Sequence, residues 1–284
     1  MDSKKSKAEI RTIIKNKIPK EINEHSVHLE KSIRNESKKL SKSILYIKST
    51  DKLVSEYAEK NSSLPSEFQW LQDNFYLAER AGKLTLTTLK EIRKLPVLSN
   101  GYSRLHEFTN IFVTGTCCDI NEDSVSEFLD LLQQETILEE KELNYFVPYV
   151  TFSMITYLKG LCKLINEKIN GKDTGDFSDK MENVFSSLRF ISTYDPSAIL
   201  LSANRIERIL AEDPSGIYPS MNKETRLDYR YELSSLAKKK HISEFEAAEC
   251  VLQLSKKENC HIGKYIFDNP LGKEKKKKTG KSYL

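Results

Sequence analysis

The chain has 284 residues, of which 38% are hydrophobic and 30% charged. A chain of this length can bury the core of one large or two small domains, and only 10 Gly and 8 Pro leave little room for a turn-dense all-β fold. The net charge of +4 is too small to indicate a nucleic-acid-binding surface, so we expect no nucleic-acid partner.

The five cysteines indicate neither a disulfide framework nor a metal site. Their number is odd, no C-x-x-C occurs, and none has zinc-finger spacing to the five histidines. We expect free thiols, buried or partly buried, in a reducing compartment, and no metal or other cofactor. The basic N-terminal segment, residues 1–19, contains no apolar signal-peptide core, and no apolar run reaches the length of a membrane span.

Apolar residues recur at helical spacing along nearly the whole chain, and no segment alternates as a strand would. We therefore predict an all-α fold, an antiparallel multi-helix bundle-like domain without significant sheet. The segment from residue 139 has the highest apolar density and should be the central buried helix, with Pro148 marking its start or a kink. The helices that we expect cover residues 20–60, from 66 onward, 102–114, 121–134, from 139 onward, 177–192 and 244–254.

The helix that starts near Ser66 carries a cluster of aromatic residues. Its members are Trp70, Phe75 and Tyr76, with Phe68 and Asn74 beside them. Each ring buries a large area, so we expect the cluster to lie mostly in the core. The alternative is a carbohydrate-stacking platform, which would require exposed rings.

We assign residues 20–270 to one helical domain and residues 271–284 to a lysine-rich tail. The cluster of turn residues at 171–175 is a candidate subdivision within that domain. Asp195 is a plausible N-cap with Pro196 at the first helical position, an arrangement that favours a helix start.

The most detailed connector in the chain runs from Asp213 to Leu233. Asp213 precedes a proline and should close the helix before it, and Gly216 can take the left-handed φ of a tight turn. Asn222 is a predicted N-cap, with Glu224 in the first turn facing the positive end of the helix dipole. We predict a helix end, a shaped turn and a helix start here.

Two arginines on the second helix of this corner, Arg226 and Arg230, are four residues apart and so share one face. We expect the Asp213 carboxylate and two tyrosine hydroxyls to bond them and lock a helix–helix corner. A phosphate or sugar site is the alternative, because arginine pairs suit phosphate, but neither a glycine-rich cradle nor metal-ligand spacing accompanies them. The residues assigned to the corner are Asp213, Gly216, Tyr218, Met221, Arg226, Tyr229 and Arg230.

The corner also carries a resemblance to a known family. The run Asp-Pro-Ser-Gly-Ile-Tyr-x-x-Met-x-x-x-Thr-Arg-x-x-Tyr-Arg, residues 213–230, is similar to the N-terminal region of bacterial cyclic β-1,2-glucan synthases. Trp70-Leu-x-Asp-Asn-Phe-Tyr-Leu-x-Glu and His261-Ile-Gly-Lys-Tyr-Ile-Phe resemble further segments of that region. The resemblance covers residues 20–270, but the side chains of 96–161 diverge, and Pro196 stands where the family usually has Trp.

The resemblance implies a cytoplasmic domain that precedes a membrane-embedded glucosyltransferase. This chain lacks Asp-x-Asp, Gln-x-x-Arg-Trp, a P-loop and a nucleophile elbow, so we expect it to be non-catalytic by itself. Its expected work is to pack against, position or regulate the membrane catalytic part, of the same protein or of a separate synthase. The lysines at 273–281 are expected to meet an anionic membrane at the inner face of the cell membrane.

Two alternatives remain open from the sequence. The first is a free-standing helical adaptor for protein interactions. The second is a sugar- or phosphate-binding protein that uses Tyr218, Arg226 and Arg230.

Overall fold

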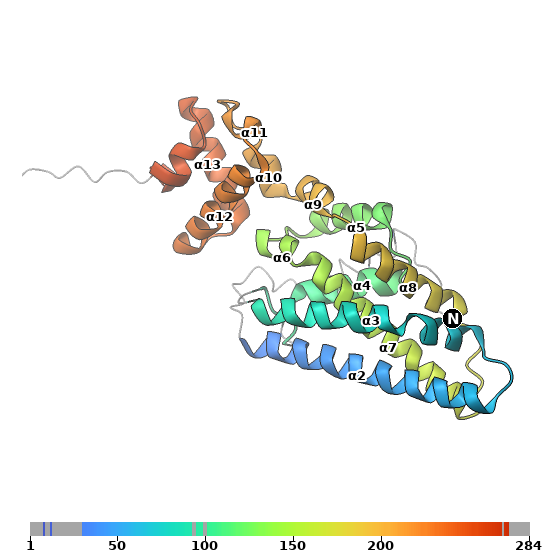
Figure 1. The fold of residues 1–284 in the computed structure, drawn as a ribbon. Helices are drawn as coiled ribbons and strands as arrows, with labels where there is room; N and C mark the ends of the chain where they lie inside the picture. Colours follow the sequence, from blue (N-terminus) through green and yellow to red (C-terminus); the bar gives the residue numbers. More distant parts are fainter. Residues whose placement is uncertain are drawn as a thin grey trace, which may run out of the picture. The chain divides into compact units, whose positions relative to one another are not determined.

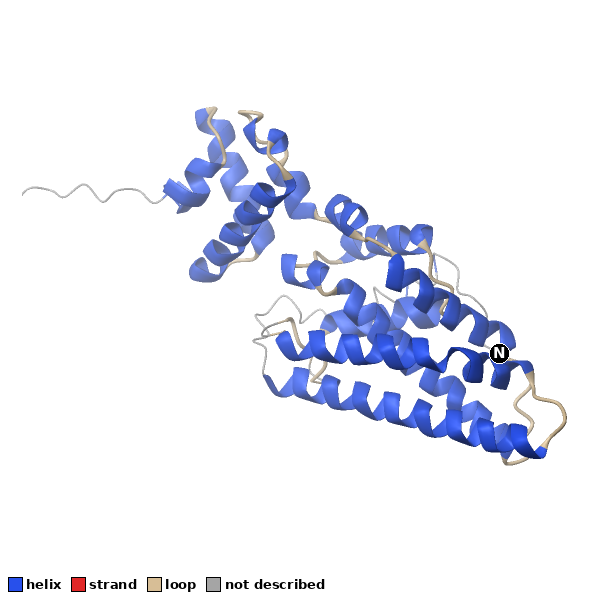
Figure 2. Cartoon of the chain, viewed as in Figure 1, coloured by secondary structure: helices blue, strands red, loops and turns tan. Residues whose placement is uncertain are grey.

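The computed structural model of the chain describes residues 8, 12, 30–92, 95–98, 101–268 and 270–272. In these ranges the chain is helical almost throughout, with no strand and a single isolated bridge between Val97 and Ser103 (Figure 2). The predicted all-α class is therefore confirmed. Most of the segment 1–19, the start of the first predicted helix at 20–29, and the lysines of the tail lie outside the described residues.

The chain divides into two compact units. Unit 1 consists of Met1–Thr136 and Lys141–Ile199, and unit 2 of Ile137–Glu140 and Leu200–Leu284. The division falls near residue 200, whereas the turn cluster at 171–175 connects two helices inside unit 1.

The helices follow the predicted order (Figure 1). The helices of unit 1 are α2 (Glu30–Lys60), α3 (Ser66–Glu91), α4 (Arg104–Gly115), α5 (Glu122–Glu135), α7 (Phe146–Ile169) and α8 (Ser178–Thr193). Those of unit 2 are α10 (Arg205–Leu210), α11 (Ile217–Ser220), α12 (Lys223–Lys240), α13 (Glu244–Glu258), η2 (Lys264–Asp268) and η3 (Pro270–Gly272). The short helices α6 (Glu140–Asn144) and α9 (Ser197–Ala203) contain the points of division.

Local sequence explains where the helices begin. The Ser103 hydroxyl accepts a hydrogen bond from the His106 N–H at the start of α4, and Asn121 forms a capping box with Ser124 at the start of α5. Such side chains satisfy N–H groups that have no partner within the helix. Pro148 lies in the first turn of α7, where its missing N–H costs no helical bond, so it marks a start and not a kink.

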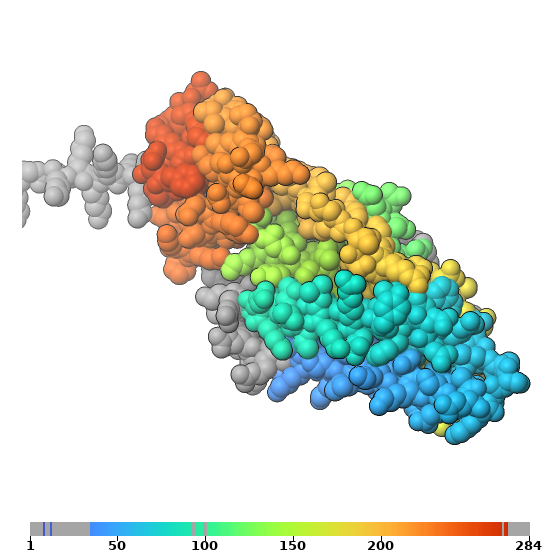
Figure 3. All heavy atoms as spheres, viewed as in Figure 1, coloured from blue at the N-terminus to red at the C-terminus, as the bar shows by residue number. Residues whose placement is uncertain are grey.

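Helix α7 is the centre of unit 1, as predicted. Half of its 24 residues are buried, and it packs against α2, α3, α4 and α8. Helices α2 and α3 lie side by side on the surface of the unit (Figure 3). The core of unit 2 is separate and forms where α10, α12, α13 and η2 meet around Tyr218, Leu233, Val251 and Tyr265.

A glycine allows α2 and α3 to approach each other closely. A Cβ at Gly82 would lie 2.8 Å from both Cγ1 and Cδ1 of Ile44, a separation well inside van der Waals contact. Ile44 is itself 8% exposed and belongs to the core, so it has little space into which to move. Gly160 on α7 is the opposite case, because nothing lies within 4 Å of the position of its Cβ.

We therefore expect the same substitution to have opposite effects at the two glycines. Gly160→Ala should raise the free energy of unfolding by about 0.5–1 kcal/mol, because alanine restricts the unfolded chain and favours helix. Gly82→Ala should lower it by about 1–3 kcal/mol through overpacking against Ile44. Urea denaturation of the two variants measures both effects, and an equal gain at both positions would contradict the close packing of α2 on α3.

Candidate functional site

The corner that begins at Asp213 has the predicted backbone. Gly216 has a φ of 68° and precedes α11, so it takes the left-handed conformation that side chains disfavour. Asn222 caps α12 by accepting a hydrogen bond of 2.8 Å from the N–H of Thr225, and Glu224 lies in the first turn. The chain thus turns from α10 through α11 into α12 by the devices that its sequence predicts.

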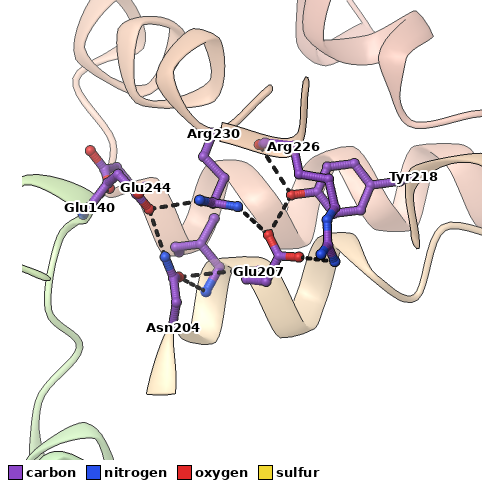
Figure 4. Close-up of polar contacts among 8 residues, drawn as sticks. Glu140, Asn204, Glu207, Tyr218, Arg226, Arg230 and Glu244 are labelled. Atoms are coloured by element: carbon purple, nitrogen blue, oxygen red, sulfur yellow. Dashed lines mark hydrogen bonds and ion pairs between the residues drawn. The ribbon is translucent and has the colours of Figure 1, made fainter. Parts of the chain in front are cut away.

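Glu207 on α10 is the polar centre of this corner (Figure 4). One of its oxygens accepts a hydrogen bond of 2.7 Å from the Tyr218 hydroxyl. The other oxygen accepts a hydrogen bond of 2.7 Å from Nη1 of Arg226. Nη1 of Arg230 donates to the first oxygen as well. Because the arginines lie one turn apart on α12, both reach the same carboxylate.

A second carboxylate, Glu140, completes the partners of Arg230. Its Oε2 accepts from Nε of Arg230 at 3.0 Å and from the Asn204 side-chain amide at 2.6 Å. The N–H of Glu140 donates to Glu244 at 3.0 Å. Glu140 is 90 residues before Arg230 in the chain, and no local pattern marks it or Glu207 as a partner of the arginines.

The prediction that Asp213 bonds the arginines is wrong. The Asp213 carboxylate instead accepts from the Ser215 hydroxyl at 2.7 Å, from the N–H groups of Tyr218 and Ile262 at 3.1 and 3.2 Å, and lies 2.7 Å from Nδ1 of His261. The turn that follows Asp213 leaves backbone N–H groups without helical partners, and the nearest carboxylate satisfies them. Burial alone would raise the pKa of Asp213, but these hydrogen bonds outweigh it and lower the pKa.

The two predicted tyrosines have different partners. The Tyr218 hydroxyl bonds Glu207, whereas the Tyr229 hydroxyl lies 2.9 Å from Nε2 of His261. A Cβ at Gly263 would approach within 3.0 Å of the Tyr229 oxygen, so glycine gives this pair its space. Met221 is partly buried against the core of unit 2.

The charges of the corner are buried and balanced. Arg230 is 6% exposed, and Glu207 and Glu140 are 5% and 4% exposed. Burial would lower the pKa of Arg230, but the carboxylates around it, Glu140 first, raise it, so the guanidinium keeps its charge. Burial and the bond to Glu207 raise the pKa of the Tyr218 hydroxyl, which therefore remains a donor.

The expectation that the aromatic cluster on α3 lies mostly in the core is wrong. Phe68 is 1% exposed, but Tyr76 is 60% exposed, and Trp70 and Phe75 are only partly buried. The aromatic positions span several faces of α3, and its packing against α2, α7 and α8 covers only some of them. Asn74 is buried, where its side chain donates to the Trp70 carbonyl and accepts from Arg189.

Unit 1 contains a buried polar cluster that the sequence analysis missed. Glu36 accepts hydrogen bonds of 2.6 Å from the Tyr149 hydroxyl and 2.7 Å from the Ser103 N–H. Beside it, Nζ of Lys39 lies 3.3 Å from Nε2 of His106. Glu36 lies 67 positions before Ser103 and 113 positions before Tyr149 in the chain, so no local motif could have indicated the cluster.

Burial shifts the pKa values of this cluster. It raises the pKa of Glu36, with the bonds from Tyr149 and Ser103 offsetting only part of the effect. It lowers the pKa of His106 to about 3 and also lowers that of Lys39. Shifted groups often mark functional sites. Here, however, Glu36 connects α2 and α7 to the residue that caps α4, which indicates a structural role.

Comparison with known proteins gives no family for the chain: no family model matches the sequence, and a search of curated proteins finds no match. Across the described ranges no group of three or more His, Cys, Asp or Glu side chains is placed to hold a metal ion. In the same ranges no helix has both the length and the apolar character of a membrane span. The predicted burial of the thiols is confirmed, with Cys117, Cys118 and Cys162 buried and the other two partly buried.

The corner predicts a large loss of stability when an arginine is removed. Arg230→Ala leaves the buried Glu140 without its cation and Glu207 with Arg226 alone, so it should lower the free energy of unfolding by about 3–5 kcal/mol. Arg226→Ala should cost less, because the Arg226 side chain is 20% exposed. The two losses should not add, since both arginines bond Glu207.

Urea denaturation of the single and double variants measures these losses. Lys256→Ala is the matched control, because it removes an exposed ion pair with Glu212 in the same unit and should change stability little. Parent-like stability in both arginine variants would contradict a structural corner.

The Glu36 cluster predicts a pH dependence of stability. A carboxyl whose folded-state pKa is raised binds its proton more tightly in the folded chain. Its contribution to stability is therefore full below the unfolded value of about 4.5 and declines as the pH rises through the folded pKa. Glu36→Gln imitates the protonated acid, so it should flatten this decline and be more stable than the parent near neutral pH.

Urea denaturation at several pH values from about 4 to about 7 tests this prediction. Glu56→Gln, at an exposed position of the same helix α2, should leave the slope of the parent unchanged. A parent-like slope in Glu36→Gln would show that another group governs this pH range.

Proposed function

We propose that the chain is a non-catalytic helical domain of a cyclic β-1,2-glucan synthase-like glucosyltransferase. It packs against, positions or regulates the membrane catalytic part, which belongs to the same polypeptide or to a separate synthase. It works at the cytoplasmic face of the cell membrane, where the lysines at 273–281 meet anionic lipid. The chain by itself carries out no glucosyl transfer.

One observation carries this proposal: the polar residues of the resemblance bond one another and their neighbours within unit 2. Nη1 of Arg226 bonds Glu207, and Arg230 bonds both Glu207 and Glu140. Asp213 and Tyr229 meet at the two ring nitrogens of His261. We infer that the segment that resembles the synthases serves to build a helical corner.

The same contacts weigh against a sugar- or phosphate-binding protein. Recognition of phosphate uses guanidinium donors that are open to the ligand. Here Arg230 is 6% exposed and donates hydrogen bonds to two carboxylates. The carboxylates would also repel an anionic ligand, so the corner favours a structural role in positioning a partner.

Deletion of the coding region for residues 30–268 in the organism that carries the gene tests the proposal. The deletion should lower the amount of cyclic β-1,2-glucan, because the catalytic part loses the domain that positions it. The glucan is extracted and identified by mass spectrometry, and a gene carrying Lys256→Ala serves as the control. An unchanged glucan level, or a parent that makes no such glucan, would contradict the proposal.

The purified chain gives the complementary measurement. Calorimetry with UDP-glucose and Mg²⁺ should show neither binding nor turnover. Micromolar binding or any turnover would make the chain itself a catalytic or donor-binding domain.

A further inference from the structure

Unit 2 has a hollow in its surface where α12 meets η2 and η3. Its volume is about 370 Å³, enough to receive a small polar group together with part of an apolar chain. Leu236 on α12 and Ile266 on η2 contribute to its lining, and both are buried. These two residues supply an apolar part of the lining, and the polar corner around Glu207 contributes nothing to it.

An exposed aromatic ring stands at this hollow. Phe267 is 45% exposed, which is unusual for a phenylalanine. It is held in place by an edge-to-face contact with Tyr229, with ring centroids 4.9 Å apart and an interplanar angle of 81°. Its exposed edge is therefore a fixed feature of the surface.

Two lysines give the hollow its charge. Lys239 and Lys240 on α12 both line it, and neither forms an ion pair within the described part of the chain. Two other lysines of unit 2 are paired, Lys256 with Glu212 and Lys264 with Glu258. The lining contains a single acidic residue, Glu232, so its net charge is positive.

We propose that this hollow is a docking surface for an anionic phospholipid bilayer. The ammonium groups of Lys239 and Lys240 would contact lipid phosphates, and Phe267 would enter the interfacial layer. Aromatic rings next to lysines are typical of protein surfaces that lie in the membrane interface. Six further lysines follow within nine residues of Gly272, where η3 ends, and they would add attraction to the same lipid surface.

The chemistry favours a lipid surface over an acidic peptide. Lysines act as flexible point charges, which suit a diffuse layer of phosphates, whereas paired recognition of peptide carboxylates favours the planar fork of arginine. No arginine lines the hollow. The inference deepens the membrane contact of the proposed function, but a vesicle assay needs no glucosyltransferase, so the two proposals can fail separately.

Co-sedimentation of the full chain with phosphatidylcholine vesicles, with and without phosphatidylglycerol, tests the inference at low and high salt. Binding should require phosphatidylglycerol and weaken at high salt. The double variant Lys239→Gln, Lys240→Gln should bind at least about tenfold more weakly, because each lysine near an anionic surface contributes roughly a fivefold factor. Phe267→Ser should weaken binding at both salt concentrations.

Two further variants make the test specific to the hollow. Lys256→Gln with Lys257→Gln on α13 removes the same charge from unit 2 and leaves the tail unchanged, and it should bind nearly as the parent does. Glu232→Gln removes the one acid of the lining and should strengthen binding. Circular dichroism confirms that each variant is folded.

Several results would overturn the inference. Equal losses in the two lysine double variants would mean that net charge alone, and not this hollow, attracts the chain to lipid. Parent-like binding of the Lys239/Lys240 variant would also exclude the hollow. Binding of an acidic peptide or of inorganic phosphate that depends on these lysines, without binding of vesicles, would assign the hollow to a different ligand.

Discussion

The carboxylate of Glu207 is the constraint on which the rest of unit 2 depends. Two guanidinium groups and a phenol converge on its two oxygens, all from the segment that follows α10. A buried charge is costly unless it is paired and its remaining positions are bonded. Helices α10 and α12 both pack on α13, and they do so in the rotation and register that bring Arg226 and Arg230 to that carboxylate. The apolar core of Ile206, Leu210 and Leu233 then closes around this arrangement.

A second set of bonds holds the ends of this arrangement. Asp213 supplies the acceptors for the turn into α11 and links that turn to His261, 48 residues further on. The other ring nitrogen of His261 lies 2.9 Å from the hydroxyl of Tyr229 on α12. The corner and the C-terminal part of unit 2 are thus fixed by polar groups that leave few donors or acceptors for a ligand. This is the physical basis for our proposal that unit 2 positions a partner.

Local sequence was sufficient to predict the helices and several of their ends. The N-cap at Asn222 and the left-handed turn at Gly216 follow from short-range chemistry, and the structure has both. The sequence allowed Pro148 to be either a helix start or a kink, and in the structure it lies at the start. Helical periodicity likewise identified α7 as the buried centre, because burial on several faces requires apolar residues on several faces.

Partners across the chain could not be predicted in this way. The spacing of Arg226 and Arg230 placed them on one face, but the predicted partner, Asp213, was wrong. The structure pairs the arginines with Glu207 and Glu140. Asp213 is instead required by the N–H groups of its own turn. The prediction that the aromatic residues on α3 are mostly buried was wrong for a related reason. Composition does not say which faces of a helix contact a neighbouring helix. The Glu36 cluster joins three helices that only the tertiary fold brings together.

Glu207 and the two arginines form one structural network that needs no other molecule. A double-mutant cycle of Glu207→Gln and Arg230→Met, measured by urea denaturation without any ligand, tests it most directly. Each single variant should be strongly destabilised, and the pair should show a coupling of about 1–3 kcal/mol. Stabilities close to the parent in both single variants, or losses that simply add, would contradict it.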